Sequence, residues 1–301
     1  MTSVPQMGIF SLGDPSHSFT EFALVHGARA SDAVAAIAGL HDPRKTTEGV
    51  NLVAGFRPEL WRAAAPVDAP ADAASFERAL VGRDGYTMPA TQADVFIWVA
   101  GAAYDNVFDV AGSIVERVRS VATPIRELTG WTYQHNRDLT GFQDGTENPT
   151  LEDAPGVALI DDGLPGAGGS ILLFQQWKHN AGAWHALATE AQERVIGRTK
   201  PDSIELDKAH MPADSHVTRT TLEEEGEELK IFRRNTPYGG VADHGTVFVG
   251  FSKQQYRLQR MLERMAGIPD GVRDALTRFS TPLTGAYYFV PALSSLVRFV
   301  T

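Results

Sequence analysis

Residues 93–100 read ADVFIWVA, and residues 105–121 read DNVFDVAGSIVERVRSV. The first stretch is a continuous apolar run rich in β-branched and aromatic residues, which is typical of a buried strand. In the second stretch apolar residues recur at helical spacing, which predicts an amphipathic helix with one face on the core. We expect Pro124 to end this helix, because proline cannot continue one. A strand followed by a helix is therefore the unit from which the fold is built.

The same alternation extends to the N-terminus. Residues 30–40 are rich in alanine and follow helical spacing, with Asp32 near the start, which predicts a helix. The patterns also predict strands at residues 8–10, 20–25, 51–56 and 129–134. The first half of the chain thus follows the order β-α-β-β-α-β.

The pattern then repeats without clear sequence identity. The predicted strands of the second half are residues 170–177 (SILLFQQW), 228–234, 246–252 (TVFVGFS) and 286–291. Its predicted helices are residues 189–197, 254–266 and 270–279. Each half matches the split β-α-β, or ferredoxin-like, motif. We predict an α+β protein with mostly antiparallel sheets, made of a half at 1–149, a Gly/Pro-rich linker at 150–169 and a half at 170–301.

Composition excludes several classes of protein. The chain has 301 residues and a formal net charge of −10, which disfavours binding to nucleic acid or to an anionic membrane surface. It contains no cysteine, so disulfides, iron–sulfur clusters and thiolate-bound metals are excluded. We see no secretory signal and no apolar run long enough to span a membrane, so we expect a cytoplasmic protein.

A loop of nine residues near the middle of the chain is the first candidate site. Residues 141–149 read GFQDGTENP. Its glycines allow close approach to the backbone, and its proline restricts the chain. The loop should be rigid and should present Asp144, Glu147 and Asn148. The alternative is an ordinary turn between two structural units.

Two segments of the second half supply further candidates. His216 lies in SHVTR (215–219), and none of the nine histidines has a short zinc-binding spacing. Arg233 and Arg234 lie in KIFRRNTPYG (230–239). Alternation along a strand puts these two arginines on opposite faces, so one can point inward while the other is solvated.

Taken together, these segments resemble a known family. The loop Gly-Phe-x-Asp-Gly-Thr-x-Asn-Pro, the segment Ile196-Gly-Arg-Thr-Lys200, the Ser-His pair, Arg-Arg-Asn and a late Phe-Val-Pro occur in the order found in the dye-decolourising peroxidases. These are haem enzymes, and Arg-Arg-Asn-Thr-Pro-Tyr-Gly is similar to their bacterial B-type subgroup. The resemblance covers nearly the whole chain, and its fold agrees with the two halves predicted above.

The resemblance implies roles for individual residues. His216 would bind the iron of haem b, and Asp144, Arg233 and Asn235 would lie on the opposite, peroxide-binding side. Arg198 would pair with a haem propionate, Glu147 would lie at the haem edge, and Asn148 would hold the loop. We assign the carboxylate that orients His216 to Asp274, with a solvated helix aspartate as the alternative. Four aromatic residues are candidates for electron relay or, alternatively, for core packing: Trp131, Tyr133, Trp177 and Trp184.

The implied function is the reduction of hydrogen peroxide, coupled to one-electron oxidation of dyes, phenolic compounds or Mn²⁺. The resemblance also implies a homo-oligomer. Because the chain ends ten residues after Pro291, we do not expect docking into an encapsulin shell. Two alternatives stay open: a non-catalytic haem carrier or sensor, and a haem-free ferredoxin-like binding protein.

Overall fold

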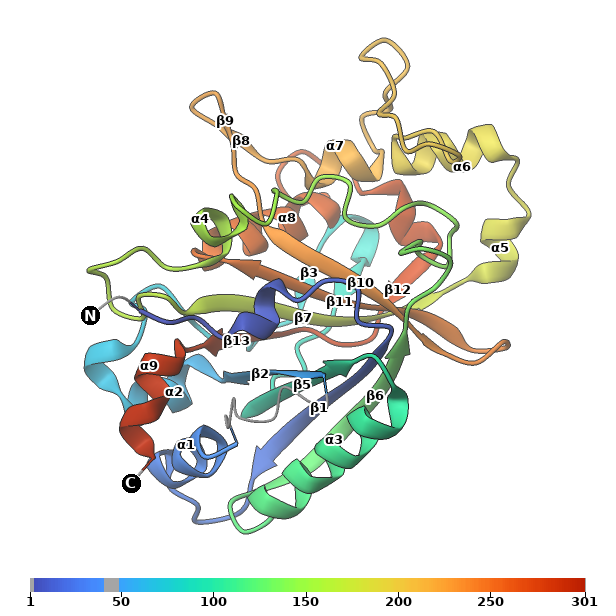
Figure 1. The fold of residues 1–301 in the computed structure, drawn as a ribbon. Helices are drawn as coiled ribbons and strands as arrows, with labels where there is room; N and C mark the ends of the chain where they lie inside the picture. Colours follow the sequence, from blue (N-terminus) through green and yellow to red (C-terminus); the bar gives the residue numbers. More distant parts are fainter. Residues whose placement is uncertain (1–2, 41–48, 301) are drawn as a thin grey trace.

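The computed structural model describes residues 3–40 and 49–300, arranged as in Figure 1. In these residues nine strands hydrogen-bond in the order β11-β10-β6-β1-β5-β2-β13-β7-β12, and β11 also pairs with β7. The N-terminal members are β1 (Ser16–Leu24), β2 (Val50–Phe56), β5 (Val95–Gly101) and β6 (Ala122–Trp131). The C-terminal members are β7 (Ser170–His179), β10 (Phe232–Gly239), β11 (His244–Ser252), β12 (Ser280–Pro282) and β13 (Ala286–Val290).

These strands form two antiparallel sheets joined at two corners. Single residue pairs make the joints, Tyr238 with Gly130 and Phe289 with Phe56. The N-terminal sheet has the order β6-β1-β5-β2, and the C-terminal sheet has the order β10-β11-β7-β13. In both sheets the first and third strands of the half lie in the centre, as two interleaved β-α-β units require. The predicted fold class, α+β with two ferredoxin-like halves, is confirmed.

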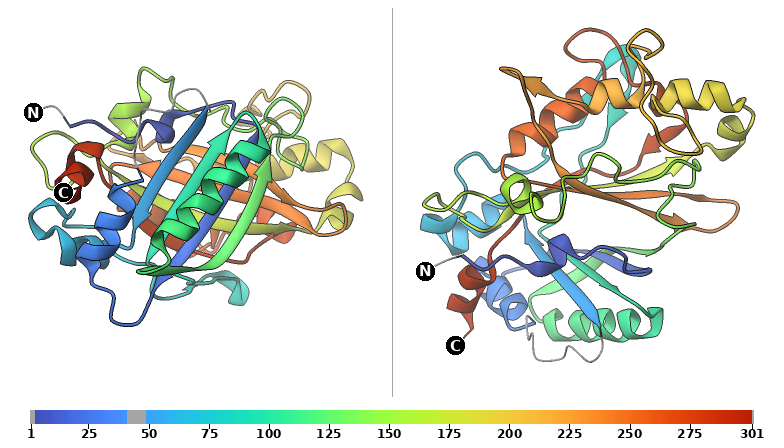
Figure 2. Two further views of the ribbon diagram at one scale, coloured as in Figure 1. Left: turned by 60° about the horizontal axis from the view of Figure 1, so that its bottom comes forward. Right: turned by 45° about the horizontal axis from the view of Figure 1, so that its top comes forward.

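Helices cover the outer face of each sheet (Figure 2). The N-terminal helices are α1 (Ala30–Ala38), α2 (Pro58–Ala64) and α3 (Tyr104–Val118). The second half contributes α4 (Ala154–Ala158), α5 (Ala181–His185), α6 (Thr189–Ile196), α7 (His216–Thr220), α8 (Gln255–Met265) and α9 (Leu293–Leu296). Of these, α4 packs on the core cluster between the sheets, and α9 packs beside α1 of the N-terminal half. Short 3₁₀ turns and two-residue strands complete the described chain: η1 (Met7–Phe10), η3 (Pro66–Asp68), β3 (Leu80–Val81), η4 (Arg83–Gly85), β4 (Thr87–Met88), β8 (Glu223–Glu224), β9 (Glu227–Glu228), η5 (Ala275–Arg278) and η6 (Val297–Phe299).

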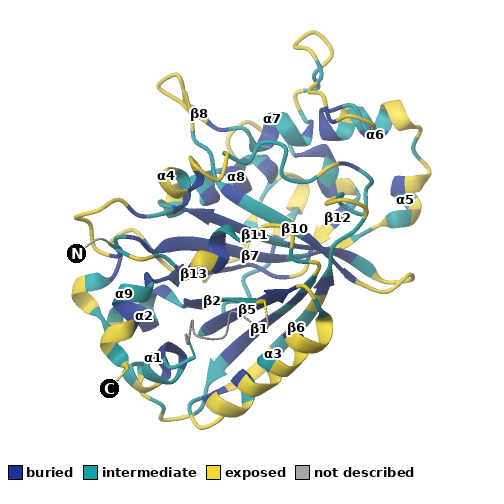
Figure 3. Cartoon of the chain, viewed as in Figure 1, coloured by how far each residue is buried: buried dark blue, intermediate teal, exposed yellow. Residues whose placement is uncertain are grey.

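The two sheets pack face to face through an aromatic interior. Phe96 of β5 lies 4.7 Å from Phe174 of β7 between ring centroids, and Trp98 stacks near Phe251 of β11. A second apolar cluster fills the space under the helices. Both faces of the central strands β5 and β7 are therefore buried over most of their length, as their dark colour in Figure 3 shows. This explains the continuous apolar runs of β5 and β7, because a strand covered on both faces has no polar side.

Several predicted element boundaries were wrong. Residues 8–10, predicted as a strand, belong to the 3₁₀ turn η1. Pro124 does not end a helix: α3 ends at Val118, and Pro124 lies inside β6. Pro124 is tolerated there because most of β6 pairs on one side only, with β1, and an unpaired edge needs no donor. The strand predicted at 129–134 is the end of β6.

In the second half, two boundaries shift. The strand predicted at 228–234 is β10, which begins at Phe232, because residues 227–228 form the separate hairpin strand β9. The helix predicted at 270–279 shrinks to the 3₁₀ turn η5, since Asp274 caps its start by accepting a hydrogen bond from the amide of Leu276. Leu276 and Thr277 of η5 line the space between the sheet and the helices.

The long crossover from β7 to β10 carries α5, α6 and α7 over the C-terminal sheet (Figure 1). It is longer than the corresponding N-terminal crossover and leaves room between α7, α8 and the sheet. Within residues 3–40 and 49–300, no helix combines the length and apolar character that a bilayer crossing requires.

Candidate active site

A large cavity lies between the outer face of the C-terminal sheet and helices α6, α7 and α8. The loop at residues 138–147 forms one of its sides. Its walls are mainly apolar, with contributions from Phe142, Ile196, Val217, Leu222, Leu229, Ile231, Phe248, Met261, Leu262, Met265 and Leu276. Its polar lining includes Asp138, Asp144, Glu147, His179, Arg198, His216, Arg233, Asn235 and Thr246. Six of the seven predicted site residues therefore line one cavity, and the seventh, Asp274, lies directly behind it.

His216 projects from the helical wall. It is the first residue of α7, whose N-cap Ser215 accepts a hydrogen bond from the amide of Thr218. The Nδ1 atom of His216 lies 2.7 Å from Oδ2 of Asp274, which is fully buried. The aspartate is held in turn by the Leu276 amide at 2.9 Å. Since a carboxylate only accepts, Nδ1 carries the proton and Nε2 keeps its lone pair for a metal. The predicted hydrogen bond to Asp274 is present.

The sheet side of the cavity holds Asp144, Arg233 and Asn235. Arg233 Nη1 donates to Asp144 Oδ1 at 2.8 Å, and Asn235 Nδ2 donates to the same oxygen at 2.6 Å. The Asn235 amide donates to Oδ2 at 2.9 Å. The three donors fix the carboxylate, which is only 12% exposed, in one orientation.

Asn148 fastens the loop to β10, as predicted. Its Oδ1 accepts from the Arg233 amide at 3.0 Å, and its Nδ2 donates to the Arg233 carbonyl at 2.7 Å. The Asn148 side chain thus forms the two backbone hydrogen bonds that a neighbouring strand would otherwise form with Arg233. This pairing sets the distance between the loop and the strand, and with it the position of Asp144 relative to Arg233.

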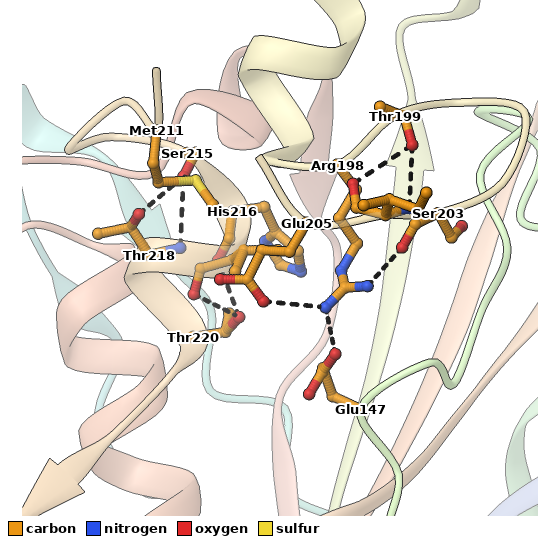
Figure 4. Close-up of polar contacts among 12 residues, drawn as sticks. Glu147, Arg198, Thr199, Ser203, Glu205, Met211, Ser215, His216, Thr218 and Thr220 are labelled. Carbon is orange, nitrogen blue, oxygen red and sulfur yellow. Dashed lines mark hydrogen bonds and ion pairs between the residues drawn. The ribbon is translucent and has the colours of Figure 1, made fainter. Parts of the chain in front are cut away.

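Arg198 and Glu147 pair with each other. The buried Arg198 guanidinium forms an ion pair with Glu147, a second one with Glu205 at 3.2 Å, and a hydrogen bond to the Ser203 carbonyl at 2.6 Å (Figure 4). Both residues line the cavity, and their predicted contacts with haem stay predictions. The guanidinium is already held by two carboxylates, so pairing with a third requires one of them to move.

Arg234 differs from the prediction that the second arginine would be solvated. It points into the space between the sheets, where its guanidinium lies 4.4 Å from the Trp98 ring and donates to backbone carbonyls of Gly8, Ile9 and Ser11. Burial lowers the pKa of Arg234 to about 9. The prediction assumed one covered face of β10, whereas both faces of this strand are covered.

The four candidate aromatic residues occupy different environments. Trp177 lines the cavity, and Trp184 is buried against Phe142 and Phe279. Trp131 and Tyr133 are half-buried at and beyond the end of β6, away from the residues that line the cavity. Trp177 is therefore the member of the set that meets the cavity directly.

Three further polar residues of the cavity were not singled out from the sequence. Asp138 is the first residue of the 138–147 loop, His179 ends β7 and Thr246 lies in β11. The Thr246 hydroxyl is hydrogen-bonded to each of the other two. Alternation along β7 offered a signal, because His179 lies on the same strand face as Gln175 and Trp177.

The donor set and the walls fit a haem. Among the described residues no three metal-ligating side chains gather around one point, and His216 offers one nitrogen to the cavity. A porphyrin supplies four nitrogens, and its faces suit apolar walls. The Nε2 atom of Gln175, buried at the cavity wall, has no partner within the described chain. The cavity thus has the chemistry of a site that is completed by a large, mostly apolar ligand.

Comparisons with known proteins give the same result. Residues 135–295 match the family "Dyp-type peroxidase, C-terminal". A dye-decolorizing peroxidase of Mycolicibacterium paratuberculosis is 36% identical over 263 residues, 86% of this chain and 73% of the relative. The structure of a Rhodococcus jostii RHA1 DypB variant in complex with heme is 34% identical, with a TM-score of 0.90 over 97% of each chain. A DypB variant in complex with manganese is 35% identical, with a TM-score of 0.88 over 94% of each chain.

Duplicated ferredoxin-like sheets, with the His216–Asp274 and Asp144–Arg233 pairs at one shared cavity, define a haem peroxidase. The chain belongs to the dye-decolourising peroxidase family.

Proposed function

We propose that this protein is a haem b peroxidase that reduces hydrogen peroxide and oxidises dyes and phenolic compounds in one-electron steps. One observation carries the proposal: a single cavity joins the His216–Asp274 pair on its helical wall to the Asp144–Arg233–Asn235 group on its sheet side. The first group suits an iron ligand, and the second suits proton transfer and charge stabilisation.

His216 would hold the iron through Nε2. The buried Asp274 keeps the proton on Nδ1 and makes the ring a stronger electron donor. Arg198 would receive a haem propionate if Glu147 or Glu205 yields its place, and Glu147 would then lie at the haem edge. When bound, haem supplies the iron that binds peroxide and stores its oxidising equivalents.

Asp144 and Arg233 would act on the peroxide itself. Asp144 takes the proton from one peroxide oxygen and returns it to the other, which makes the second oxygen a better leaving group. Arg233 places a fixed positive charge beside the negative charge that develops as the O–O bond breaks. Asn235 holds Asp144 through two hydrogen bonds. The Asp144–Arg233 ion pair explains how a partly buried carboxylate and a partly buried guanidinium coexist before peroxide enters.

The identity of the electron donor, the assembly and the location are finer predictions. A relative in complex with manganese supports Mn²⁺ as an additional donor. We propose a homo-oligomer. One structural neighbour, of Mycobacterium smegmatis, is an encapsulated DyP-type peroxidase. A shell-sized particle in size-exclusion chromatography of material from the native host would show that this protein is packaged in the same way. The cytoplasmic location stays a prediction.

Hemin titration followed by a dye assay tests the function. We expect a Soret band on adding hemin, and peroxide-dependent bleaching of an aromatic dye by the loaded protein. His216→Ala should abolish tight hemin binding. His210→Ala, an exposed histidine of the same crossover, should leave binding unchanged. Absence of a Soret band in the parent protein would refute the haem proposal. A Soret band without dye oxidation would refute the peroxidase and favour a non-catalytic haem carrier or sensor.

A further inference from the structure

Outside the Asp144 group, the cavity contains a second hydrogen-bonded chain. Thr246 Oγ1 donates to Asp138 Oδ2 at 2.5 Å and lies 3.1 Å from Nε2 of His179. The other oxygen of Asp138 accepts from the Thr140 amide at 2.8 Å. The side chains of Asp138, His179 and Thr246 all line the cavity. They come from three separate elements, the loop, β11 and β7, so their convergence depends on the tertiary fold.

The direction of the chain follows from the number of hydrogens. A threonine hydroxyl has one hydrogen, and Asp138, as a carboxylate, can only accept it. Toward His179 the same hydroxyl must therefore accept, which places a hydrogen on Nε2. Neutral His179 then carries its proton on Nε2 and leaves Nδ1 as an acceptor. The chain is thus aligned Nε2–H to Oγ–H to carboxylate, ready to pass a proton toward Asp138.

His179 also lies on the wall of a second, smaller cavity. That cavity is lined by His244, His185, Trp184 and Phe279, among others, and His244 is partly exposed. The rings of His179 and His244 are 6.4 Å apart between centroids. Burial lowers the pKa of His179, against the opposing effect of Asp138 and with a smaller contribution from His244. The imidazole is accordingly neutral at neutral pH, with one donor and one acceptor nitrogen.

We propose that His179, Thr246 and Asp138 form a proton-entry path from the small cavity to the peroxide side of the large cavity. This inference rests on the proposed peroxidase function. Reduction of one H₂O₂ to two H₂O consumes two electrons, from the donor, and two protons. The Asp144 group moves a proton between the peroxide oxygens, but it does not import one from solvent.

The transfer balances at each atom. The Thr246 hydroxyl gives its proton to the Asp138 carboxylate, while its oxygen takes the Nε2 proton of His179 and Nδ1 takes a proton from the small cavity. Asp138 then gives the proton it has gained to water in the large cavity. The hydroxyl rotates back toward Asp138, and His179 regains its starting tautomer when Nδ1 loses a proton to solvent and Nε2 takes one up, so each cycle imports one proton. His179 and Thr246 are positioning residues in this scheme, since neither touches the peroxide.

Thr246→Val tests the path, because it removes the hydroxyl at almost constant volume. In the haem-free protein, ¹⁵N NMR of the His179 imidazole should show the Nε2–H tautomer, and this preference should be lost in Thr246→Val. In the loaded protein, turnover should fall about tenfold, less than the ~10²–10⁴-fold of a group at the reacting atoms. The solvent isotope effect should rise, and small proton-donating buffers should restore the rate.

Two further variants keep the test decisive. Thr246→Ser keeps the hydroxyl and should retain the parent tautomer and rate. Thr20→Val changes a buried strand threonine of the N-terminal sheet and should affect neither. An Nδ1–H tautomer in the parent, or unchanged turnover and isotope effect in a folded Thr246→Val protein, would overturn the path. A parent protein that binds no hemin refutes the proposed function instead, and the tautomer measurement stands apart from that result.

Discussion

At the scale of single residues, Arg233 and Asp144 share one ion pair but do different work. The guanidinium offers a fixed charge that water cannot replace, and losing one such preorganised group typically costs ~10²–10³-fold in rate. A water molecule can take over part of a missing proton shuttle. Arg233→Leu also leaves Asp144 with Asn235 as its remaining side-chain donor. We therefore expect Arg233→Leu to slow the reaction with peroxide more than Asp144→Ala does.

Stopped-flow mixing of each hemin-loaded variant with peroxide measures this order. Both variants need equal haem loading, checked by the Soret absorbance. A slower reaction in Asp144→Ala than in Arg233→Leu between pH 4 and 8 would make the carboxylate the principal catalyst and refute the electrostatic argument.

Asp274 should control the electron density at the metal through His216. Replacing its charge by an amide in Asp274→Asn keeps an acceptor for Nδ1 but weakens the charge-assisted hydrogen bond. We expect the ferric–ferrous reduction potential to rise by about 60 mV, which corresponds to about 1.4 kcal/mol for one electron. Spectroelectrochemical titration measures the shift. Asp270→Asn is the control, because it weakens the ion pair that holds Arg219 of α7 and does not contact His216. An equal rise of the reduction potential in Asp270→Asn would mean that the position of α7, and not the hydrogen bond to His216, sets the potential.

At the scale of elements, one asparagine attaches the catalytic loop to β10. Asn148→Ala removes two hydrogen bonds to the Arg233 backbone and should lower the free energy of unfolding by about 1–3 kcal/mol. The loop would then hold Asp144 less firmly, so peroxide should react more slowly as well. Urea denaturation and stopped-flow mixing measure the two effects. Thr150→Ala, which removes an exposed bond to Asp153, should change neither by a comparable amount.

Sequence patterns identified elements well and element ends poorly. The apolar runs of β5 and β7 could be read because they are covered on both faces. The limits of β6 and β10 could not, since an edge pairing decides whether Pro124 is tolerated and a neighbouring hairpin decides where β10 begins. The one-sided pairing of β6 is a tertiary fact without a local signature, whereas the Glu225-Gly226 turn of the hairpin is a local signal that the strand prediction overlooked. Arg234 shows the same limit, because its burial depends on Trp98 in the other half.

At the scale of the whole molecule, the repeated β-α-β-β-α-β pattern predicted the fold class, and motif resemblance predicted six of the polar residues that line the cavity. The sequence could not reveal Asp138, His179 and Thr246, because only the packed sheet brings them together. It also could not show that the N-terminal half stabilises β10 from behind, through the backbone carbonyls that bind Arg234. The division into halves at residues 150–169 stays a prediction.

The packing of the two sheets also makes stability depend on pH. His17 of β1 is 5% exposed, and its Nδ1 lies 3.2 Å from the Trp98 indole nitrogen, which donates to it. Burial, reinforced by the charge of Arg234, lowers the pKa of His17 from 6.5 to about 4. Above pH 6.5 the imidazole is neutral in the folded and unfolded chains, and the stability is complete. Between pH 6.5 and 4 the unfolded chain alone binds the proton, so stability falls as pH falls, by about 3 kcal/mol in total.

His17→Asn should remove this pH dependence, because asparagine keeps an acceptor for Trp98 but does not titrate. We expect the free energy of unfolding of the parent protein to fall more steeply than that of the variant from pH 6.5 to 4, and the two curves to run parallel below pH 4. Urea denaturation of the haem-free proteins at each pH gives the difference in free energy of unfolding between the parent and the variant. Contributions from other titrating groups such as Glu21 cancel in this difference. His26→Asn, at an exposed histidine, should follow the parent curve. If the free energies of unfolding of the parent and of His17→Asn stay parallel from pH 6.5 to 4, the folded protein binds the proton as readily as the unfolded chain. The site beside Trp98 and Arg234 would then accept the charged imidazole without unfolding of the molecule.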